Sequence, residues 1–357
     1  MTALNCPACE ARLQTILRGR IVGRPEMAID AANRQISPGQ RMAGRTTVHT
    51  IDDAVDVMSG WRLELMQMSP GKIRYSLSVV QFGSIQVFRE RTDKTLLKRG
   101  LSWPGSLVFS LPIDAQGTGW LSGHEVNPEI SLLVDGRMLP EILTPQCFDL
   151  IYVAVDRQHL AAFAAERGHA GLVGHILHSQ SLALWHDRQA GLARLFSGLF
   201  EDDAALEAGE PDHAGLELFV LEKLLAALTL ARKIEAVNDT DNKRLMDRAR
   251  LMLMKNRSEP ATISEVASHL GISRRYLQTC FNRSVGLPAK EFVRAERLNR
   301  VRSALCQARR ENRIVSIGDV AALWGFWHLS RFAGDYRDMF GELPSETLHS
   351  PASSQNG

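Results

Sequence analysis

The stretch WGFWHLSRFAGDYRDMFGELP, residues 324–344, contains two tryptophans, three phenylalanines and a tyrosine, in a chain that is only 6% aromatic. Rings at this density can line a ligand pocket, stack on bases, or form the core of a small helical unit. Phe332 and Tyr336 are four residues apart, so on a helix they point the same way. We interpret four rings as core residues: Phe326, Phe332, Tyr336 and Phe340. Trp327 is placed at the start of the second helix of its unit, where it can be exposed.

The same pattern occurs twice. SEVASHLGISRRYLQTCFNRSVGLP, residues 264–288, and GDVAALWGFWHLSRFAGDYRDMFGELP, residues 318–344, share a Val-Ala pair followed by a glycine four residues after the alanine. Gly271 and Gly325 stand where a first helix must end in a sharp turn, because glycine tolerates positive φ. Ser273 suits the N-cap of the next helix. Each copy therefore predicts a helix–turn–helix unit.

The segment between the copies, KEFVRAERLNRVRSALCQA, predicts one long helix. Its apolar positions fall on a single stripe, and the remaining surface is rich in arginine. The residues of this stripe are Phe292, Leu298, Val301 and Leu305. Such a helix would hold the two units in a fixed relation, on one side of a DNA duplex and about one helical turn apart.

The charge distribution agrees with a nucleic-acid partner for this half. From residue 241 to the end, 19 Lys and Arg face 12 Asp and Glu, whereas the first 240 residues carry 23 against 28. The overall charge of +2 hides this asymmetry. A basic half is typical of proteins that bind nucleic acid, although a basic face is also often only a solvated one.

These motifs together resemble the DNA-binding domain of the AraC/XylS family of bacterial transcription regulators, over about residues 250–347. The matching stretches are ISEVASHLGISRRYLQTCF, AERLNRVRSAL and GDVAALWGFWHLSRFAGDYRDMFGELPS. The version WGFWHLSRFAGDYRDMFGELPSETL, with MSPGKIRYSLSVVQFGSIQVFRERT and SWPGSLVFSLP upstream, most resembles the ethanolamine-operon-regulator branch. The GLPA stretch departs from the family, which usually has its proline one position later. The resemblance implies promoter DNA, RNA polymerase and a second copy of the chain as partners.

In the first unit, the side chains off the Leu277/Phe281 face are Arg274, Arg275, Gln278, Thr279 and Asn282. On the family pattern, groove contacts fall at Ser273, Arg275, Gln278 and Thr279. Arginine and glutamine can pair with guanine and adenine edges, so we expect Arg275 and Gln278 to reach bases. The alternative for Arg274 and Arg283 is that they only touch phosphate.

In the second unit, the family's contacting positions are His328, Leu329, Ser330, Arg331, Ala333 and Gly334. Three of these six residues lack a polar side chain, so this copy should read less sequence than the first. We expect the contacts to come mainly from His328, Ser330 and Arg331. In an alternative interpretation, Trp327 or Leu329 contacts a thymine methyl group.

The rest of the chain predicts three further segments, which makes the fold class α+β. Residues 1–45 are polar with little periodicity and suggest a flexible arm. Residues 46–156 contain short period-two runs such as KIRYSLSVV, typical of a β-sandwich or small barrel, here expected to be cupin-like. Residues 157–238 are expected to be helical, including QSLALWHDRQAGLARLFSGLFE and LELFVLEKLLAALTLARKI, and to pack on the β-domain or dimerise it. Residues 240–349 then form the double helix–turn–helix domain.

Other classes of protein find little support. The chain has no apolar run of 18 residues and no signal-peptide pattern, so we expect a cytoplasmic protein without a membrane contact. Cys6 and Cys9 form a lone CxxC, read either as two thiols on a loose arm or as a metal or redox pair. No phosphate loop, GxSxG or HExxH occurs, so we expect no enzyme, cofactor or metal.

Three hypotheses therefore stay open. The first is a sequence-specific regulator whose β-domain senses a small effector. The second is a constitutive regulator whose β-domain only dimerises. The third is an enzyme with a DNA-binding tail, which would need a convergent set of reactive side chains in the β-domain. The sequence does not identify effector-binding residues, the operator, or activation against repression.

Overall fold

The computed structural model describes residues 45–126, 131–172, 174, 181–183, 186–200, 213–229, 233–235, 238–255 and 261–350. The chain divides into two units, 1–37 and 38–357, and every described residue belongs to the second. The predicted arm therefore lies outside the described residues apart from its last position, and so do Cys6 and Cys9. No helix among the described residues is long and apolar enough to cross a membrane.

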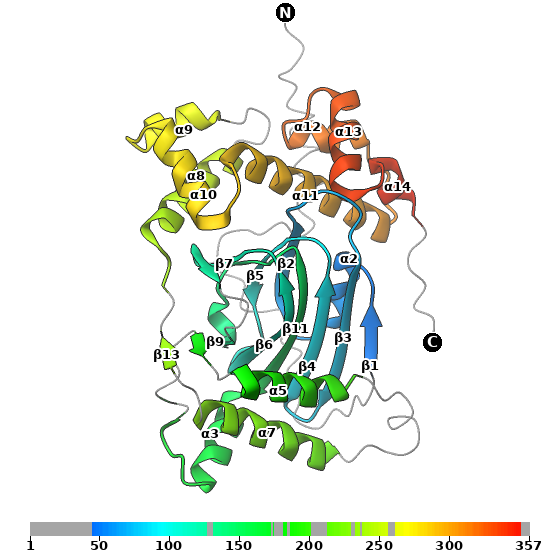
Figure 1. The fold of residues 1–357 in the computed structure, drawn as a ribbon. Coiled ribbons are helices and arrows are strands. Elements are labelled where there is room, and N and C mark those ends of the chain that lie inside the picture. Colours follow the sequence, from blue (N-terminus) through cyan, green and yellow to red (C-terminus); the bar gives the residue numbers. More distant parts are fainter. Residues whose placement is uncertain are drawn as a thin grey trace, which may run out of the picture. The chain divides into compact units, whose positions relative to one another are not determined.

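Two antiparallel sheets form the first part of the described chain (Figure 1). The six-stranded sheet has the order β1 (Arg45–Val48), β3 (Tyr75–Phe82), β4 (Ile85–Thr92), β11 (Cys147–Asp156), β6 (Ser106–Gln116) and β9 (Leu132–Asp135). The five-stranded sheet has the order β2 (Arg62–Gln67), β5 (Leu96–Leu101), β10 (Ile142–Leu143), β7 (Gly119–Leu121) and β8 (His124–Val126). Helix α2 (Ile51–Val57) and the short turn η1 (Gly136–Met138) complete this part.

The period-two prediction for KIRYSLSVV is confirmed. Tyr75, Leu77 and Val79 point from β3 into the core between the two sheets. Gly83, with φ of +52°, and Ser84 then form the two-residue turn that leads into β4, as expected where a hairpin turn requires positive φ. The mixture of helices with antiparallel sheets agrees with the predicted α+β class, while the cupin-like assignment stays a prediction.

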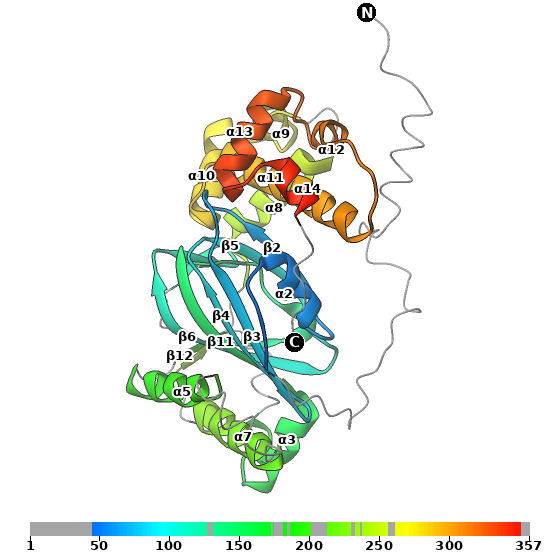
Figure 2. The same ribbon diagram turned by 90° about the vertical axis from the view of Figure 1, so that its right-hand side faces the viewer.

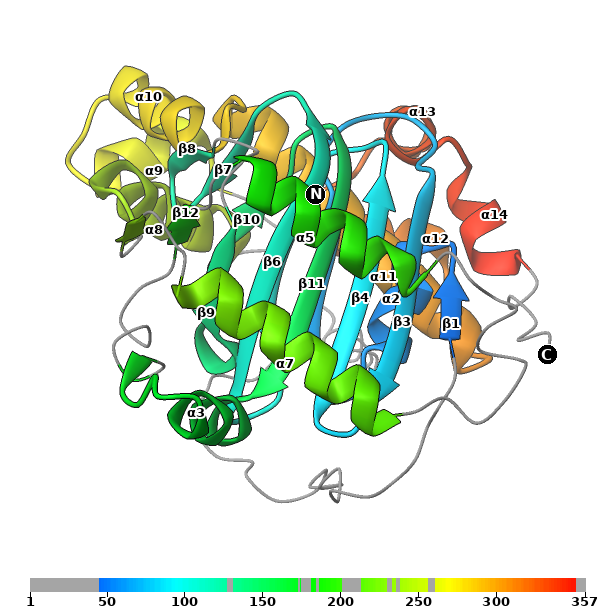
Figure 3. The ribbon, with the colours of Figure 1, turned by 60° about the horizontal axis from the view of Figure 1, so that its bottom comes forward.

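Helices cover the opposite face of the six-stranded sheet. In Figure 3, α5 (His186–Gly198) and α7 (His213–Thr229) run across its strands, and α3 (Arg157–Glu166) follows β11. Phe196, Val220 and Leu224 from these helices are buried against Phe109 and Ile151 of the sheet. The mostly apolar surface of the 213–229 helix is therefore explained by packing.

The prediction of continuous helices in this segment is wrong in two places. Ser181–Ala183 forms strand β12 and Lys233–Glu235 forms strand β13, and the two pair antiparallel with Leu182 opposite Ile234. Helix α5 consequently begins only at His186, and α7 ends at Thr229. Strands of three residues are too short to show period-two alternation, so they were hidden inside longer helical patterns.

The last part of the described chain is helical. Its elements are α8 (Asp241–Lys255), α9 (Ile263–His269), α10 (Arg274–Val285), α11 (Ala289–Arg310), α12 (Ile317–Leu323), α13 (Leu329–Phe340) and α14 (Pro344–His349). The long helix predicted between the two copies is confirmed as α11. Figure 2 shows α12, α13 and α14 gathered around α11. The four residues of the predicted apolar stripe on α11 are all buried.

Candidate nucleic-acid interface

The first unit consists of α9, a short turn and α10. Thr262 and Glu265 form a capping box at the start of α9, which satisfies two free backbone N–H groups. Gly271 has a φ of +68°, and the Ile272 amide donates back to the Ala267 carbonyl at 3.0 Å. Ser273 then caps α10 by accepting a hydrogen bond from the Tyr276 amide at 3.1 Å. The roles predicted for Gly271 and Ser273 are confirmed.

The inner face of α10 is fully buried. Leu277 and Phe281 have no exposed surface, and the Phe281 ring meets the edge of Phe292 on α11 at 5.7 Å between centroids. Cys280 lies on the same side, and its thiol donates to Asn242 Oδ1 on α8 at 3.5 Å. Burial raises the pKa of this thiol above its ordinary value, so it stays neutral. This packing fixes which face of α10 is presented outward.

The outer face of α10 carries the predicted DNA-contacting residues. Gln278 and Thr279 are half-buried, while the others are exposed, namely Ser273, Arg274, Arg275, Asn282 and Arg283. Gln278 Nε2 donates to Asn282 Oδ1 at 3.2 Å, which holds two amide side chains together on the surface. The Thr279 hydroxyl donates to the Arg275 carbonyl at 3.1 Å, so it can offer DNA an acceptor rather than a donor. Tyr276, 47% exposed on the same helix, was not singled out from the sequence.

The second unit is built in the same way with a longer turn. Ser316 caps α12, and Gly325 has a φ of +81°. Helix α13 begins only at Leu329, with His328 as its N-cap. The placement of Trp327 at the start of this helix is therefore wrong by two residues. The extra residue of this copy lengthens the turn, and Trp327 lies in it with 57% of its surface exposed.

Four of the rings in the opening stretch form one core. Phe326 lies 5.1 Å from Phe332, Phe332 lies 5.7 Å from Tyr336, and Tyr336 lies 4.6 Å from Phe340, between ring centroids. Tyr336 Oη also lies 2.8 Å from Thr347 Oγ1 on α14. The interpretation as core is confirmed: Phe332, Tyr336 and Phe340 are buried, and Phe326 is half-buried against them. The exposed side chains here are Trp327, His328, Leu329, Ser330 and Arg331.

A basic groove lies between the two units. It has an empty volume of about 1130 Å³, including the part open to solvent, and extends from the start of α9 across α11 to the turn before α13. Its basic side chains are Lys290, Arg294, Arg297, His328 and Arg331. Arg294 pairs with Asp335 and Arg297 donates to the Leu253 carbonyl at 2.9 Å, while Lys290 and Arg331 are exposed. The arginine-rich surface of residues 290–308 was noted in the sequence, but only the fold shows which of its members line a groove.

Comparison with known proteins agrees with this architecture. A helix-turn-helix domain family model matches residues 266–350. The XylDLEGF operon transcriptional activator 2 of Pseudomonas putida is 32% identical over 120 residues, which are 34% of this chain and 75% of that protein. The probable thc operon regulatory protein of Rhodococcus erythropolis is 36% identical over 90 residues, but these span only 26% of its length. The chain therefore belongs to the AraC/XylS family of transcriptional regulators.

Two solved structures align over most of the chain. The AraC-like transcriptional activator CuxR covers 78% of this chain and all of its own, with 17% identity and a TM-score of 0.39. ToxT from Vibrio cholerae O395, bound to (E)-4-(8-methylnaphthalen-1-yl)but-3-enoic acid, covers 81% of this chain and 98% of its own, with 14% identity and a TM-score of 0.30. Within the described residues, no group of three or more His, Cys, Asp or Glu side chains could hold a metal ion.

Proposed function

We propose that this protein is a cytoplasmic, sequence-specific transcription regulator that reads promoter DNA with two helix–turn–helix units. One observation carries the proposal: α10 and α13 each bury an apolar face and present a polar face outward, and one helix, α11, joins the two units. The proposed DNA contacts are made by residues exposed or half-buried on the outer faces of the two units, namely Ser273, Arg274, Arg275, Gln278, Thr279, Asn282, Arg283, Trp327, His328, Ser330 and Arg331. We further propose that it acts through RNA polymerase as an activator, a role that the name of the XylDLEGF operon transcriptional activator supports.

A homodimer formed by the helices on the six-stranded sheet completes the proposal. Leu195 on α5 and Leu218 on α7 are each 45% exposed, although both helices bury their other faces. A contiguous apolar patch on a surface marks an interaction site, and we propose that these two leucines belong to one. On this division, residues 46–156 sense a small effector, residues 157–238 dimerise the chain, and residues 240–349 bind DNA. The ethanolamine-operon-regulator branch stays a prediction, since it rests on the sequence resemblance alone.

The first test is selection of DNA from a random pool with the full-length protein at two salt concentrations. The proposal expects an enriched motif with two blocks about ten base pairs apart. A second copy of that motif would support the dimer. Binding without enrichment, fading uniformly as salt rises, would instead show backbone attraction alone and would contradict the proposal.

Helix α10 should contribute more to base recognition than helix α13. Replacing Arg275 with alanine should weaken binding to the selected motif by about 1–3 kcal/mol and relax the preference at one base pair. Arg331→Ala should have the smaller effect on specificity, because its neighbours Leu329, Ala333 and Gly334 offer no hydrogen bonds. Titrations against the motif and its single-base variants measure both. If Arg275→Ala weakened binding equally on every DNA sequence, the arginine would contact a phosphate rather than a base.

The groove between the units should contact the DNA backbone. Lys290→Gln is expected to weaken binding to all sequences alike, and to reduce the slope of log K against log salt by about 1. The control is Lys223→Gln on α7. This helix covers the face of the six-stranded sheet that points away from the five-stranded sheet, so this substitution should leave the slope unchanged. A Lys290→Gln variant with the slope of the unmodified protein would remove this groove from the interface.

A further inference from the structure

The β-domain contains a cavity between its two sheets. Its empty volume is about 830 Å³, including the part open to solvent. The walls are mostly apolar, with Val108, Leu132 and Leu150 on one sheet and Leu63 and Ile142 on the other. A largely apolar cavity with a few polar groups is the ordinary form of a small-molecule site.

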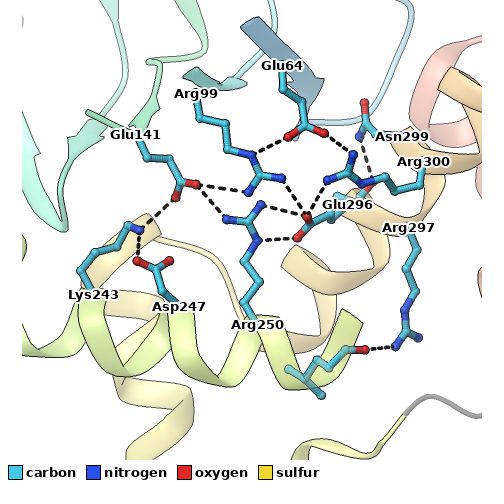
Figure 4. A network of polar contacts seen from close by, with 12 residues as sticks. Glu64, Arg99, Glu141, Lys243, Asp247, Arg250, Glu296, Arg297, Asn299 and Arg300 are labelled. Carbon is cyan, nitrogen blue, oxygen red and sulfur yellow. Dashed lines mark hydrogen bonds and ion pairs between the residues drawn. The ribbon is translucent and has the colours of Figure 1, made fainter. Parts of the chain in front are cut away.

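The two cations at this cavity are already paired within the protein. Lys98 Nζ forms an ion pair with Glu90, which is almost fully buried and also accepts from the Tyr75 hydroxyl at 3.0 Å. The Arg99 guanidinium pairs with Glu64, Glu141 and Glu296 (Figure 4). A ligand carboxylate would therefore enter an apolar space without a free counter-ion, which is costly.

An uncharged ligand would find one polar group that is poorly satisfied. Tyr152 is one of the residues that line the cavity, and its hydroxyl donates to the Met58 thioether at 3.8 Å, a weak acceptor. A neutral oxygen on a ligand would be a better partner for this hydroxyl. The cavity thus suits a molecule that is mostly apolar and carries a hydroxyl, ether or carbonyl rather than a charge.

A single sheet separates this cavity from the DNA-binding domain. Along β5, Leu96 and Lys98 face inward, whereas Leu97 and Arg99 face α8 and α11. The same alternation places Ile142 inward on β10 and Leu143 outward. Because side chains alternate along a strand, a shift of this sheet on one face moves the groups on the other.

The same sheet and the loop that follows β2 contact both recognition helices near their C-terminal ends. Gly286, the C-cap residue of α10, packs closely against the Trp120 ring of β7. A Cβ atom added to this glycine would lie only 2.2 Å from the ring. At α13, Gln67 Nε2 donates to the Met339 carbonyl at 2.6 Å and the Gly71 amide donates to the Asp338 carbonyl at 2.8 Å. The relative position of the two helices is therefore set by the sheet as well as by α11.

Between these two points, polar pairs lie beside the apolar contact that Leu97 and Leu143 make with the helices. Asn299 of α11 donates to the Gln67 carbonyl at 2.7 Å and accepts from the Gln67 amide at 2.9 Å, as a neighbouring strand would. Beside this pair, four acidic and four basic side chains form a network of ion pairs (Figure 4). They are Glu64, Glu141, Asp247 and Glu296 with Arg99, Lys243, Arg250 and Arg300.

We propose that the cavity binds an uncharged, mostly apolar molecule, and that the five-stranded sheet transmits its presence to both recognition helices at once. The proposal rests on the proposed function and adds the class of effector and the route by which it acts. An anionic ligand is disfavoured because the charges of Lys98 and Arg99 are already neutralised by carboxylates of the protein, so neither cation is left to pair with the ligand. The ends of α10 and α13 respond together because Trp120 and Gln67 belong to the same sheet.

The ligand class is tested with two probes of the same ring size, 2-naphthylmethanol and 2-naphthoate. Calorimetric titration of the full-length protein without DNA should give the neutral alcohol at least a tenfold lower Kd than the anion. Equal or tighter binding of 2-naphthoate would overturn the proposal, and so would the absence of binding by both probes. Because no DNA is present, this result does not depend on the proposed function.

A substitution at the ion pair should reverse the selectivity. Glu90→Gln keeps the size of the side chain but frees the Lys98 ammonium, so the Kd for 2-naphthoate should fall about tenfold. The double variant Glu90→Gln, Lys98→Met should lose that gain. Unchanged 2-naphthoate binding in Glu90→Gln, with normal binding of the alcohol to show that the variant is folded, would contradict the charge argument.

The route is tested with the selected motif. Saturating 2-naphthylmethanol should change the Kd for DNA at least fivefold in the unmodified protein. Gln67→Leu with Asn299→Leu, and separately Trp120→Ala, should reduce that change while keeping the Kd for the alcohol within twofold. Ligand binding that leaves DNA affinity unchanged would overturn transmission through the sheet. Failure to select any motif would count against the proposed function instead, and the ligand results would stand.

Discussion

Replacing Glu296 with alanine should lower the free energy of unfolding by about 3–5 kcal/mol, because it leaves buried positive charge without its partner. Arg250 donates to both oxygens of this carboxylate, at 2.7 and 2.8 Å, and both side chains are almost fully buried. Arg99 and Arg300 lie 3.5 and 3.6 Å from the same oxygen. One substitution thus removes the common partner of three guanidinium groups.

Denaturant titration of the full-length protein measures this loss. Glu291→Ala is the matched control, since Glu291 is an exposed glutamate on the same helix. Its removal should cost well under 1 kcal/mol, as surface charges near a helix start typically do. Similar losses for both variants would show that the buried network adds little beyond a surface ion pair.

The same network shows how a buried charge cluster depends on all of its members. Burial raises the pKa of Glu296, while Arg99 and Arg300 oppose that shift. Burial alone would lower the pKa of Arg99, but Glu64, Glu296 and Glu141 raise it above its ordinary value. The Arg99 guanidinium is thus held by carboxylates from three other segments of the chain, so the loss of Glu296 should be felt by Arg99 as well.

The helix–turn–helix units could be read from the sequence because their determinants are local. Leu277 and Phe281 are one helical turn apart, and Gly271 and Ser273 mark the turn and the cap within a few residues of them. Helical period, glycine at positive φ and an N-cap all act over short sequence distances. The structure therefore agrees with the sequence at these positions.

The contact between the sheet and α11 could not be read in this way. Gln67 and Asn299 are 232 residues apart, and each is an ordinary polar residue in its own segment. Glu64, Arg99 and Glu296 are likewise unremarkable singly, because only the packing of the sheet on α8 and α11 buries them together. Contacts between residues so far apart in the chain leave no periodicity or fixed spacing in the sequence, so they cannot be predicted from it.

Replacing Phe332 with alanine should remove about 3–5 kcal/mol from the stability of the second helix–turn–helix unit, as is usual for a buried ring. Phe332 is almost fully buried and contacts Phe326 and Tyr336. Losing this ring leaves a cavity between α12 and α13 that a unit of this size cannot easily close. The selected DNA motif should then keep its first block and lose its second.

The matched control is Trp327→Ala, which removes a larger ring from the same stretch but from an exposed position. Hydrogen exchange of the amides in α12 and α13 measures local stability directly, and repeated DNA selection measures the second block. Trp327→Ala should leave amide protection unchanged, and any effect on DNA would then come from a lost contact to the duplex. A Phe332→Ala variant that keeps both protection and the second block would mean that this core is held by α11 and α14 without its central ring.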